Sequence, residues 1–318
     1  MNSMFSGCKV TELNVSGFDT SKVTDMASMF NGCTGLTQLD VSKFNTSANK
    51  NYKNMFKDCS SLASIDVSGF DTSSGTDFSY MFCGCTGLTS LDVSDFNTSL
   101  STSFCGMFSG CSALTLIDVS GFDTAMSTSF SYMFSNCSAL TSIDVSGFDT
   151  ALCTDFSFMF KSCIALTSID ASNFDTSSCT NFRDMFNACR ALTSLNVSGF
   201  NTSIATNMNA MFFDCQSLTE LNLSSFDILS VVDVGNMFSY SKELVKIYVT
   251  PFDESNGTGW NLENLSATSN VFFACYKLVG GQGTVFDSTK LDKTYARIDG
   301  GADVPGYFTN IADKPVTP

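Results

Sequence analysis

Residues 133–150, MFSNCSALTSIDVSGFDT, contain the block of sequence that decides the fold, because close copies of it recur along almost the whole chain. The Met-Phe pair that opens the block recurs every 26 residues, at Met29, Met55, Met81, Met107, Met133, Met159, Met185, Met211 and Met237, with an earlier copy at Met4. A fixed short period is typical of a solenoid, in which each repeat buries its apolar face by stacking on its neighbours. The sequence therefore predicts about ten stacked repeats.

Each repeat is predicted to contain a strand, a turn and a helix. In residues 62–70, LASIDVSGF, apolar Ile65 and Val67 alternate with polar residues, as in a strand with one buried face. A polar turn follows, and the apolar residues of 78–88 then fall at helical spacing behind Thr76, which is placed to cap the helix. The predicted fold is an α/β solenoid similar to a leucine-rich-repeat array. A parallel sheet would form its concave face and short helices its convex face.

Aromatic and cysteine residues recur in columns that the repeat would bury. Ten of the 14 cysteines share one column: Cys8, Cys33, Cys59, Cys85, Cys111, Cys137, Cys163, Cys189, Cys215 and Cys275. We interpret them as free thiols that act as small apolar side chains, since packed helices would hold equivalent Cα atoms roughly 8–10 Å apart, beyond the reach of a disulfide. A bridge between Cys153 and Cys179 stays open as the alternative.

Composition excludes several classes of function. The net charge of −15 argues against nucleic acid and anionic lipid as partners, and the chain has no His and no zinc-site spacing. We find no catalytic motif and expect no enzyme, no cofactor and no metal site. No apolar run approaches the roughly 20 residues of a membrane span. The chain starts partway through a repeat and without a signal peptide, so we expect it to be a fragment.

Four segments are predicted along the chain. Residues 1–250 form the regular array, and residues 251–277 hold a lengthened, degenerate last repeat. Residues 278–309 cap the open end, with Gly-rich turns. Residues 310–318 form a tail or linker.

The repeat resembles a known family. Residues 140–163, LTSIDVSGFDTALCTDFSFMFKSC, resemble the repeat of the BspA-like leucine-rich-repeat surface proteins of bacteria, and the resemblance covers nearly the whole chain. Residues 278–309 look like the segment that closes such arrays. The resemblance implies a secreted or cell-surface bacterial protein used for adhesion, and it implies no particular ligand.

One outward column of the predicted strands is a candidate binding surface. Its carboxylates are Asp40, Asp66, Asp92, Asp118, Asp144 and Asp170, and singular residues on the same face are Leu116, Glu220, Lys246 and Tyr248. The first interpretation is structural, with each Asp bonded to the neighbouring Ser hydroxyl. A basic protein segment is the second, and calcium is a third, which the flat, even spacing of the ligands disfavours.

We therefore predict a non-catalytic adhesion module at the cell surface that binds a protein, possibly a basic one, or a glycan on its concave face. The alternative is a structural solenoid that associates end to end through its uncapped first repeat.

Overall fold

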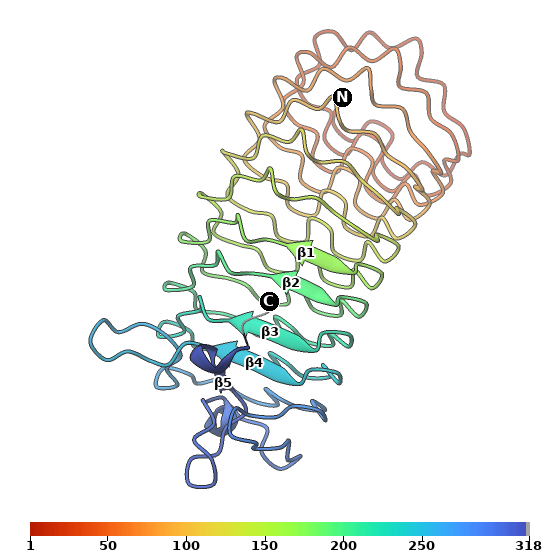
Figure 1. The fold of residues 1–318 in the computed structure, drawn as a ribbon. Helices are drawn as coiled ribbons and strands as arrows, with labels where there is room; N and C mark the ends of the chain where they lie inside the picture. The colour runs from red at the N-terminus through yellow and green to blue at the C-terminus, as the bar shows by residue number, and fades with distance from the viewer. Residues whose placement is uncertain (316–318) are drawn as a thin grey trace. The chain divides into compact units, whose positions relative to one another are not determined.

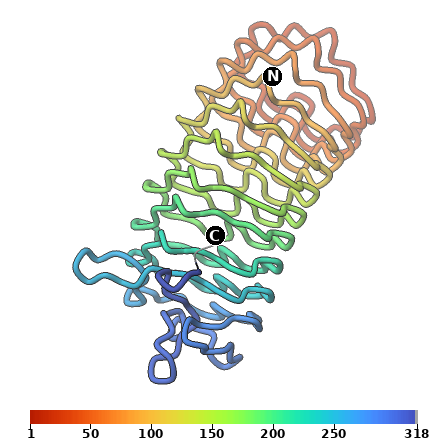
Figure 2. Tube along the Cα trace, in the orientation of Figure 1, coloured from red at the N-terminus to blue at the C-terminus, as the bar shows by residue number. Residues whose placement is uncertain are grey.

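The computed structural model describes residues 1–315, and the chain forms two compact units. The first unit comprises Met1–Cys153 with Met159–Leu166, and the second comprises Thr154–Phe158 with Thr167–Pro318. Within each unit the chain winds through successive coils that stack on one another (Figures 1 and 2). The 26-residue period is therefore one turn of the coil in each unit.

Parallel, in-register pairing joins the coils. In the second unit β1 (Ser168–Asp170) pairs with β2 (Ser194–Asn196), while β4 (Lys246–Val249) pairs with β3 (Glu220–Leu223) and with β5 (Thr309–Asn310), all in parallel. Partners in β1–β2 and β3–β4 lie one repeat apart in the sequence. The first unit has isolated parallel bridges with the same register, such as Glu12 with Gln38. The predicted parallel pairing of repeats is confirmed.

The predicted helices are wrong, because the described part of the chain contains no α-helix. Its only helical segments are the short 3-10 helices η1 (Lys293–Tyr295) and η2 (Ile311–Asp313). Residues 78–88 form a series of tight turns in which Tyr80 and Gly84 have φ of 58° and 73°. A right-handed helix cannot pass through such left-handed residues.

The same two positions of the repeat are left-handed in every coil. The first position is occupied by Ser3, Ser28, Asn54, Tyr80, Gly106, Tyr132, Phe158, Asp184, Ala210, Asn236 and Asn270. The second is occupied by Gly7, Gly32, Asp58, Gly84, Gly110, Asn136, Ser162, Ala188, Asp214, Tyr240 and Ala274. The turns are thus a fixed part of the repeat.

Hydrogen bonds explain why turns replace the helix. Met81 N donates to Phe78 O within one turn at 3.2 Å, whereas the next amide, of Phe82, donates to Met107 O of the following coil at 2.9 Å. A helix would satisfy both amides inside its own segment. Hydrogen bonds from the amides of one coil to the carbonyl oxygens of the next hold the turn segments at the spacing of neighbouring strands, about 4.8 Å. The short helices that we predicted for the convex face are therefore absent from the described residues.

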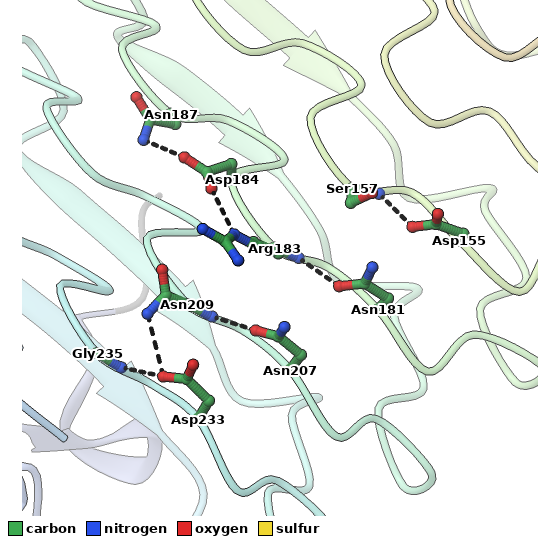
Figure 3. Close-up of polar contacts among 10 residues, drawn as sticks. All are labelled: Asp155, Ser157, Asn181, Arg183, Asp184, Asn187, Asn207, Asn209, Asp233 and Gly235. Carbon is green, nitrogen blue, oxygen red and sulfur yellow. Dashed lines mark hydrogen bonds and ion pairs between the residues drawn. The ribbon is translucent and has the colours of Figure 1, made fainter. Parts of the chain in front are cut away.

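An Asp or Asn side chain opens most of the turn segments, and Ser103 and Ser129 take this place in two others. In the second unit, Asp155 Oδ1 accepts the amide of Ser157 and Asn207 Oδ1 accepts that of Asn209, both at 2.9 Å (Figure 3). The predicted cap, Thr76, instead donates its hydroxyl to Lys50 O of the preceding coil at 3.1 Å. The next residue, Asp77, accepts the amide of Ser79, as Asx residues do at turns. Because these amides belong to turns, the bonds fix the start of each turn segment.

Phenylalanine rings fill the core in stacked files, as predicted. In the first unit Phe30, Phe56, Phe82, Phe108, Phe134 and Phe160 are fully buried. Successive ring centroids in this file lie 5.5 to 6.1 Å apart. In the second unit Phe212 and Phe238 stack at 5.9 Å. This separation is close to the coil spacing, so one ring per coil packs on the next.

None of the 14 cysteines, all of which lie in the described residues, forms a disulfide, and the thiol column is buried beneath the turns except at Cys8, which is partly exposed. Cys59 Sγ donates to Phe30 O of the preceding coil at 3.2 Å, and this contact recurs along the column. Burial raises the pKa of Cys59 to about 12. The free-thiol interpretation is confirmed, although the helix spacing from which we argued it is absent. Cys153 and Cys179, the alternative pair, are both buried, and no disulfide joins them.

Residues 278–315, which we call the C-terminal segment, pack on the last coil of the second unit. Trp260 Nε1 donates to Ala296 O at 2.7 Å, and the Trp260 ring meets Phe308 edge-on at 4.8 Å. Residues 310–315 differ from the predicted tail, because they complete β5 and form η2. The rest of that predicted tail, residues 316–318, lies outside the described residues. The boundaries at 250, 277 and 309 remain predictions.

Replacing Ala188 by glycine is expected to stabilise the second unit. Alanine in the left-handed region, here with φ of 59°, costs about 1–2 kcal/mol. Glycine costs about 0.5–1 kcal/mol in chain entropy, so the net gain is roughly 0.5–1 kcal/mol in the free energy of unfolding by urea. Ala191→Gly, in the same segment but without a positive φ, should lower that free energy. A loss in both variants would contradict the assignment of left-handed turns.

Candidate interaction face

The acidic column of the first unit is ordered by local hydrogen bonds. Asp66 Oδ1 accepts the Ser68 amide at 3.0 Å and the Ser68 hydroxyl at 2.7 Å. These two bonds lower the pKa of Asp66, while the neighbouring charges of Asp40 and Asp92 raise it by less. The hydroxyl and amide of the Ser two positions on lower the pKa in the same way at Asp40, Asp92, Asp118, Asp144 and Asp170. The carboxylates are exposed and ionised at neutral pH.

The predicted hydrogen bonding of these aspartates to their serines is therefore confirmed, and each pair closes a turn. The hydrogen bonds engage one carboxylate oxygen, Oδ1, in each turn. Exposed carboxylates of this kind can still attract a basic group.

In the first unit, two adjoining hollows lie along this column and together form a groove. The first, of about 640 Å³, is lined by residues 12–16, 37–40 and 64–66. The second, of about 450 Å³, is lined by residues 64–66, 90–92 and 116–118. Both share Ser64, Ile65 and Asp66. We call the combined hollow, which crosses five coils, the strand groove.

Aspartates and apolar side chains alternate along the strand groove. Its lining includes Leu39, Ile65, Leu91 and Ile117, which are almost fully buried at 7 to 9% exposure. Leu116 lies at one end and is 60% exposed. The groove can therefore offer negative charge and apolar contact together.

Most of the predicted residues of the first unit line this groove: Asp40, Asp66, Asp92, Asp118 and Leu116. Asp144 belongs to the same column and is exposed, but it does not line the hollows. Glu12, Thr37, Ser64 and Ser90 also line the groove and were not predicted. Their sequence signal is the strand alternation itself, which places them on the same face as the aspartates.

The predicted residues of the second unit lie on its strands, and two of them have internal partners. Asp170 ends β1, and Glu220 of β3 pairs in register with Lys246 of β4. Lys246 Nζ donates to Gly280 O at 2.8 Å. Its ammonium group is therefore engaged by the C-terminal segment.

Tyr248 is not on an accessible face, contrary to the prediction. It is 3% exposed, β5 lies beside it, and Lys314 Nζ lies 4.9 Å from its ring centroid. Burial, followed by the nearby Glu220 carboxylate, raises the pKa of Tyr248. The physical reason is that the C-terminal chain returns as a strand beside β4 and covers this tyrosine.

The described residues hold no group of three or more Asp, Glu, Cys or His side chains that could bind a metal ion. Among them there is also no helix with the length and apolarity that crossing a membrane requires. The strand groove, with its exposed carboxylates and apolar lining, is the candidate site.

Stacked coils joined by in-register parallel pairing define a repeat protein. The chain belongs to the family described as Mycoplasma protein of unknown function, DUF285, whose family model matches residues 1–115, 63–168, 88–194 and 154–279. No curated protein sequence matches it.

Several solved structures of leucine-rich-repeat proteins are similar to the chain. A leucine-rich repeat protein from Bacteroides ovatus is 16% identical, with 88% of this chain and 80% of that one covered and a TM-score of 0.34. A leucine rich cell surface protein from Faecalibacterium prausnitzii is 20% identical, with 77% and 76% covered and a TM-score of 0.33. The T. pallidum leucine-rich repeat protein is 15% identical, with 68% and 67% covered and a TM-score of 0.25. None of these matches is described as an enzyme.

Proposed function

We propose that the chain is a non-catalytic module that binds a basic, extended segment of a partner protein in the strand groove. The observation that carries this proposal is the coincidence of four ionised aspartates with an apolar lining in one hollow. The sequence resemblance to BspA-like proteins supports a place on a bacterial cell surface and a role in adhesion.

The energetics favour a partner that uses both features of the groove. An exposed ion pair contributes only about 0.2–1 kcal/mol, so several pairs are needed for measurable affinity from charge alone. Contact of an aliphatic side chain with Leu116 and with the exposed parts of the lining adds roughly 25 cal/mol per Å² of buried apolar area. A segment that carries Lys or Arg together with Leu or Ile suits the groove best.

Neutralising the groove is expected to weaken binding of a synthetic octapeptide of alternating Lys and Leu at least tenfold. The variant combines Asp66→Asn, Asp92→Asn and Asp118→Asn. Asparagine keeps the turn, since Asn14 Oδ1 accepts the amide and hydroxyl of Ser16 in the same way. Fluorescence anisotropy of the labelled peptide measures the dissociation constant, which should also rise with salt because exposed charges are screened.

The control removes the same amount of charge elsewhere in the first unit. Asp19→Asn, Asp71→Asn and Asp123→Asn change the aspartates of the other turn, where Asn45 and Asn97 already occur in the same column. This control should change the dissociation constant less than twofold. Equal weakening in the two triple variants would mean that only net charge matters, and it would overturn the assignment to the strand groove.

A further inference from the structure

The regular period breaks once in the second unit, and the break builds a separate pocket. Met237 and Val271 hold equivalent places in their coils but are 34 residues apart, against 26 in the regular array. The added residues form a loop that projects from the stack (Figures 1 and 2). Asp253 N donates to Thr258 O at 2.9 Å across this loop, and Ile228 N donates to Gly259 O at 3.2 Å. The loop is therefore fastened to the corner of a coil.

A hollow of about 400 Å³ lies between this loop and the two preceding turns, and we call it the corner pocket. It is lined by Phe200, Asn201, Ser203, Ser224, Ser225, Phe226, Asp227, Thr250, Thr258 and Gly259. Gly259 is required in its wall, because it has φ of +103° and an added Cβ would lie 2.5 Å from Pro251 O. The inserted loop thus supplies part of the pocket wall, through Thr258 and Gly259.

Polar groups in the corner pocket are left open for a ligand. Asp227 Oδ1 accepts the Leu229 amide at 3.0 Å, while its Oδ2 has no hydrogen-bond partner in the described chain. In most repeats the residue at the place of Leu229 is a serine, as at Ser73, whose hydroxyl donates to Asp71 at 2.6 Å. The Ser203 and Ser224 hydroxyls and the Asn201 amide nitrogen likewise have no partner within the described residues.

The chemistry of the lining selects the class of ligand. No Lys or Arg lines the pocket, and Asp227 is acidic, so phosphates and anionic sugars are disfavoured. Its hydroxyls, amide and carboxylate match a ligand that carries many hydroxyl groups, each of which donates and accepts hydrogen bonds. The Phe200 and Phe226 rings beneath them are 1% exposed, which gives the lining an apolar base. The volume falls within the range of small-ligand sites.

We propose that the corner pocket binds a single neutral sugar residue. Asp227 Oδ2 accepts hydrogen bonds from sugar hydroxyls, and the Asn201 side chain donates one from its amide nitrogen. The hydroxyls of Ser203 and Ser224 both donate and accept. The site lies outside the strand groove and does not depend on the function proposed for it. One sugar ring makes few contacts, so affinity for the free monosaccharide is modest, on the order of 1 mM.

Saturation-transfer NMR of the whole chain tests this proposal with glucose, galactose, mannose, N-acetylglucosamine and N-acetylgalactosamine, one at a time. At least one of these sugars should receive saturation, and N-acetylneuraminic acid, which is anionic, should receive none. Ser203→Ala with Ser224→Ala should raise the dissociation constant at least tenfold. Alanine already occupies the place of Ser203 at Ala125 and Ala151, so the fold should tolerate it.

The matched control is Ser73→Ala with Ser94→Ala, which removes the equivalent two hydroxyls from the first unit, where no inserted loop stands. Its affinity should equal that of the unaltered chain. Asp227→Asn keeps the turn, as Asn201 does in the same column, and should weaken binding severalfold. If no neutral sugar receives saturation, or if the Ser203 and Ser224 variant binds as well as its control, the corner pocket is not a sugar site.

Discussion

Replacing Phe108 by alanine is expected to lower the free energy of unfolding of the first unit by about 3–5 kcal/mol. The ring is fully buried and stacks on Phe82 at 6.1 Å and on Phe134 at 5.8 Å. Loss of the ring removes buried apolar area and leaves a cavity between two coils. Backbone hydrogen bonds between these coils hold them in place. These coils cannot close the gap without breaking bonds such as that from Phe108 N to Met133 O. Little relaxation is therefore available.

Urea unfolding followed by hydrogen exchange of peptides from the first unit measures this loss. Leu116→Ala is the control, because this leucine is 60% exposed and its truncation should cost less than about 0.5 kcal/mol. A loss below about 1 kcal/mol for Phe108→Ala would contradict a rigid file of rings and indicate that the coils can repack.

The parts of the fold that depend on the period could be predicted from the sequence. In-register stacking places equivalent residues in files, so the buried positions of Phe108 and Cys111 follow directly from the repeat. The outward column of aspartates follows from strand alternation. The sequence could not give the depth of the strand groove, because that depends on how Ile65 and its equivalents sit between the aspartates.

The helix prediction was wrong because periodicity alone does not separate a helix from tandem turns. Apolar residues three and four apart face one side in both structures, and the residues between them decide the outcome. Gly32, Gly84 and Gly110 precede the column cysteine, and Asp58 and Asn136 replace them in other repeats. Glycine, Asp and Asn are the residues that most readily adopt a left-handed conformation. This column was the signal for turns.

Features that occur once along the chain were the hardest to predict. Tyr248 follows the outward alternation, yet β5 covers it because residues 309–310 return beside β4. The corner pocket depends on an insertion whose path has no counterpart in other repeats. A repeating pattern carries no information about such contacts, since each is made by a segment that is present only once.

Replacing Asp299 by alanine is expected to release the C-terminal segment from the second unit at a cost of about 3 kcal/mol or more. Asp299 is 4% exposed and accepts the amides of Gln282, Thr284 and Gly301 at 2.9 to 3.0 Å, together with the Thr284 hydroxyl at 2.7 Å. Alanine would leave these donors, which lie in partly buried hydrogen bonds, without their acceptor. Opening should speed hydrogen exchange across residues 280–309 and change the fluorescence of Trp260, whose indole is bonded to Ala296.

The contribution of Asp299 to the packing of the C-terminal segment changes with pH in one direction. Burial alone would raise the pKa of Asp299, but the hydrogen bonds from Thr284, Gly301 and Gln282 outweigh burial and hold its pKa below the usual value. A depressed folded-state pKa contributes stability above the unfolded-state value of about 3.9 and loses it as the pH falls through the folded-state value. Exchange of residues 280–309 should therefore quicken, relative to the intrinsic rate, only below about pH 4.

Asp303→Ala, which changes an exposed carboxylate nearby, should leave this profile unaltered. If residues 280–309 exchange as slowly in the Asp299→Ala variant as in the unaltered chain, the aromatic contacts of Trp260 and Phe308 hold the segment without Asp299.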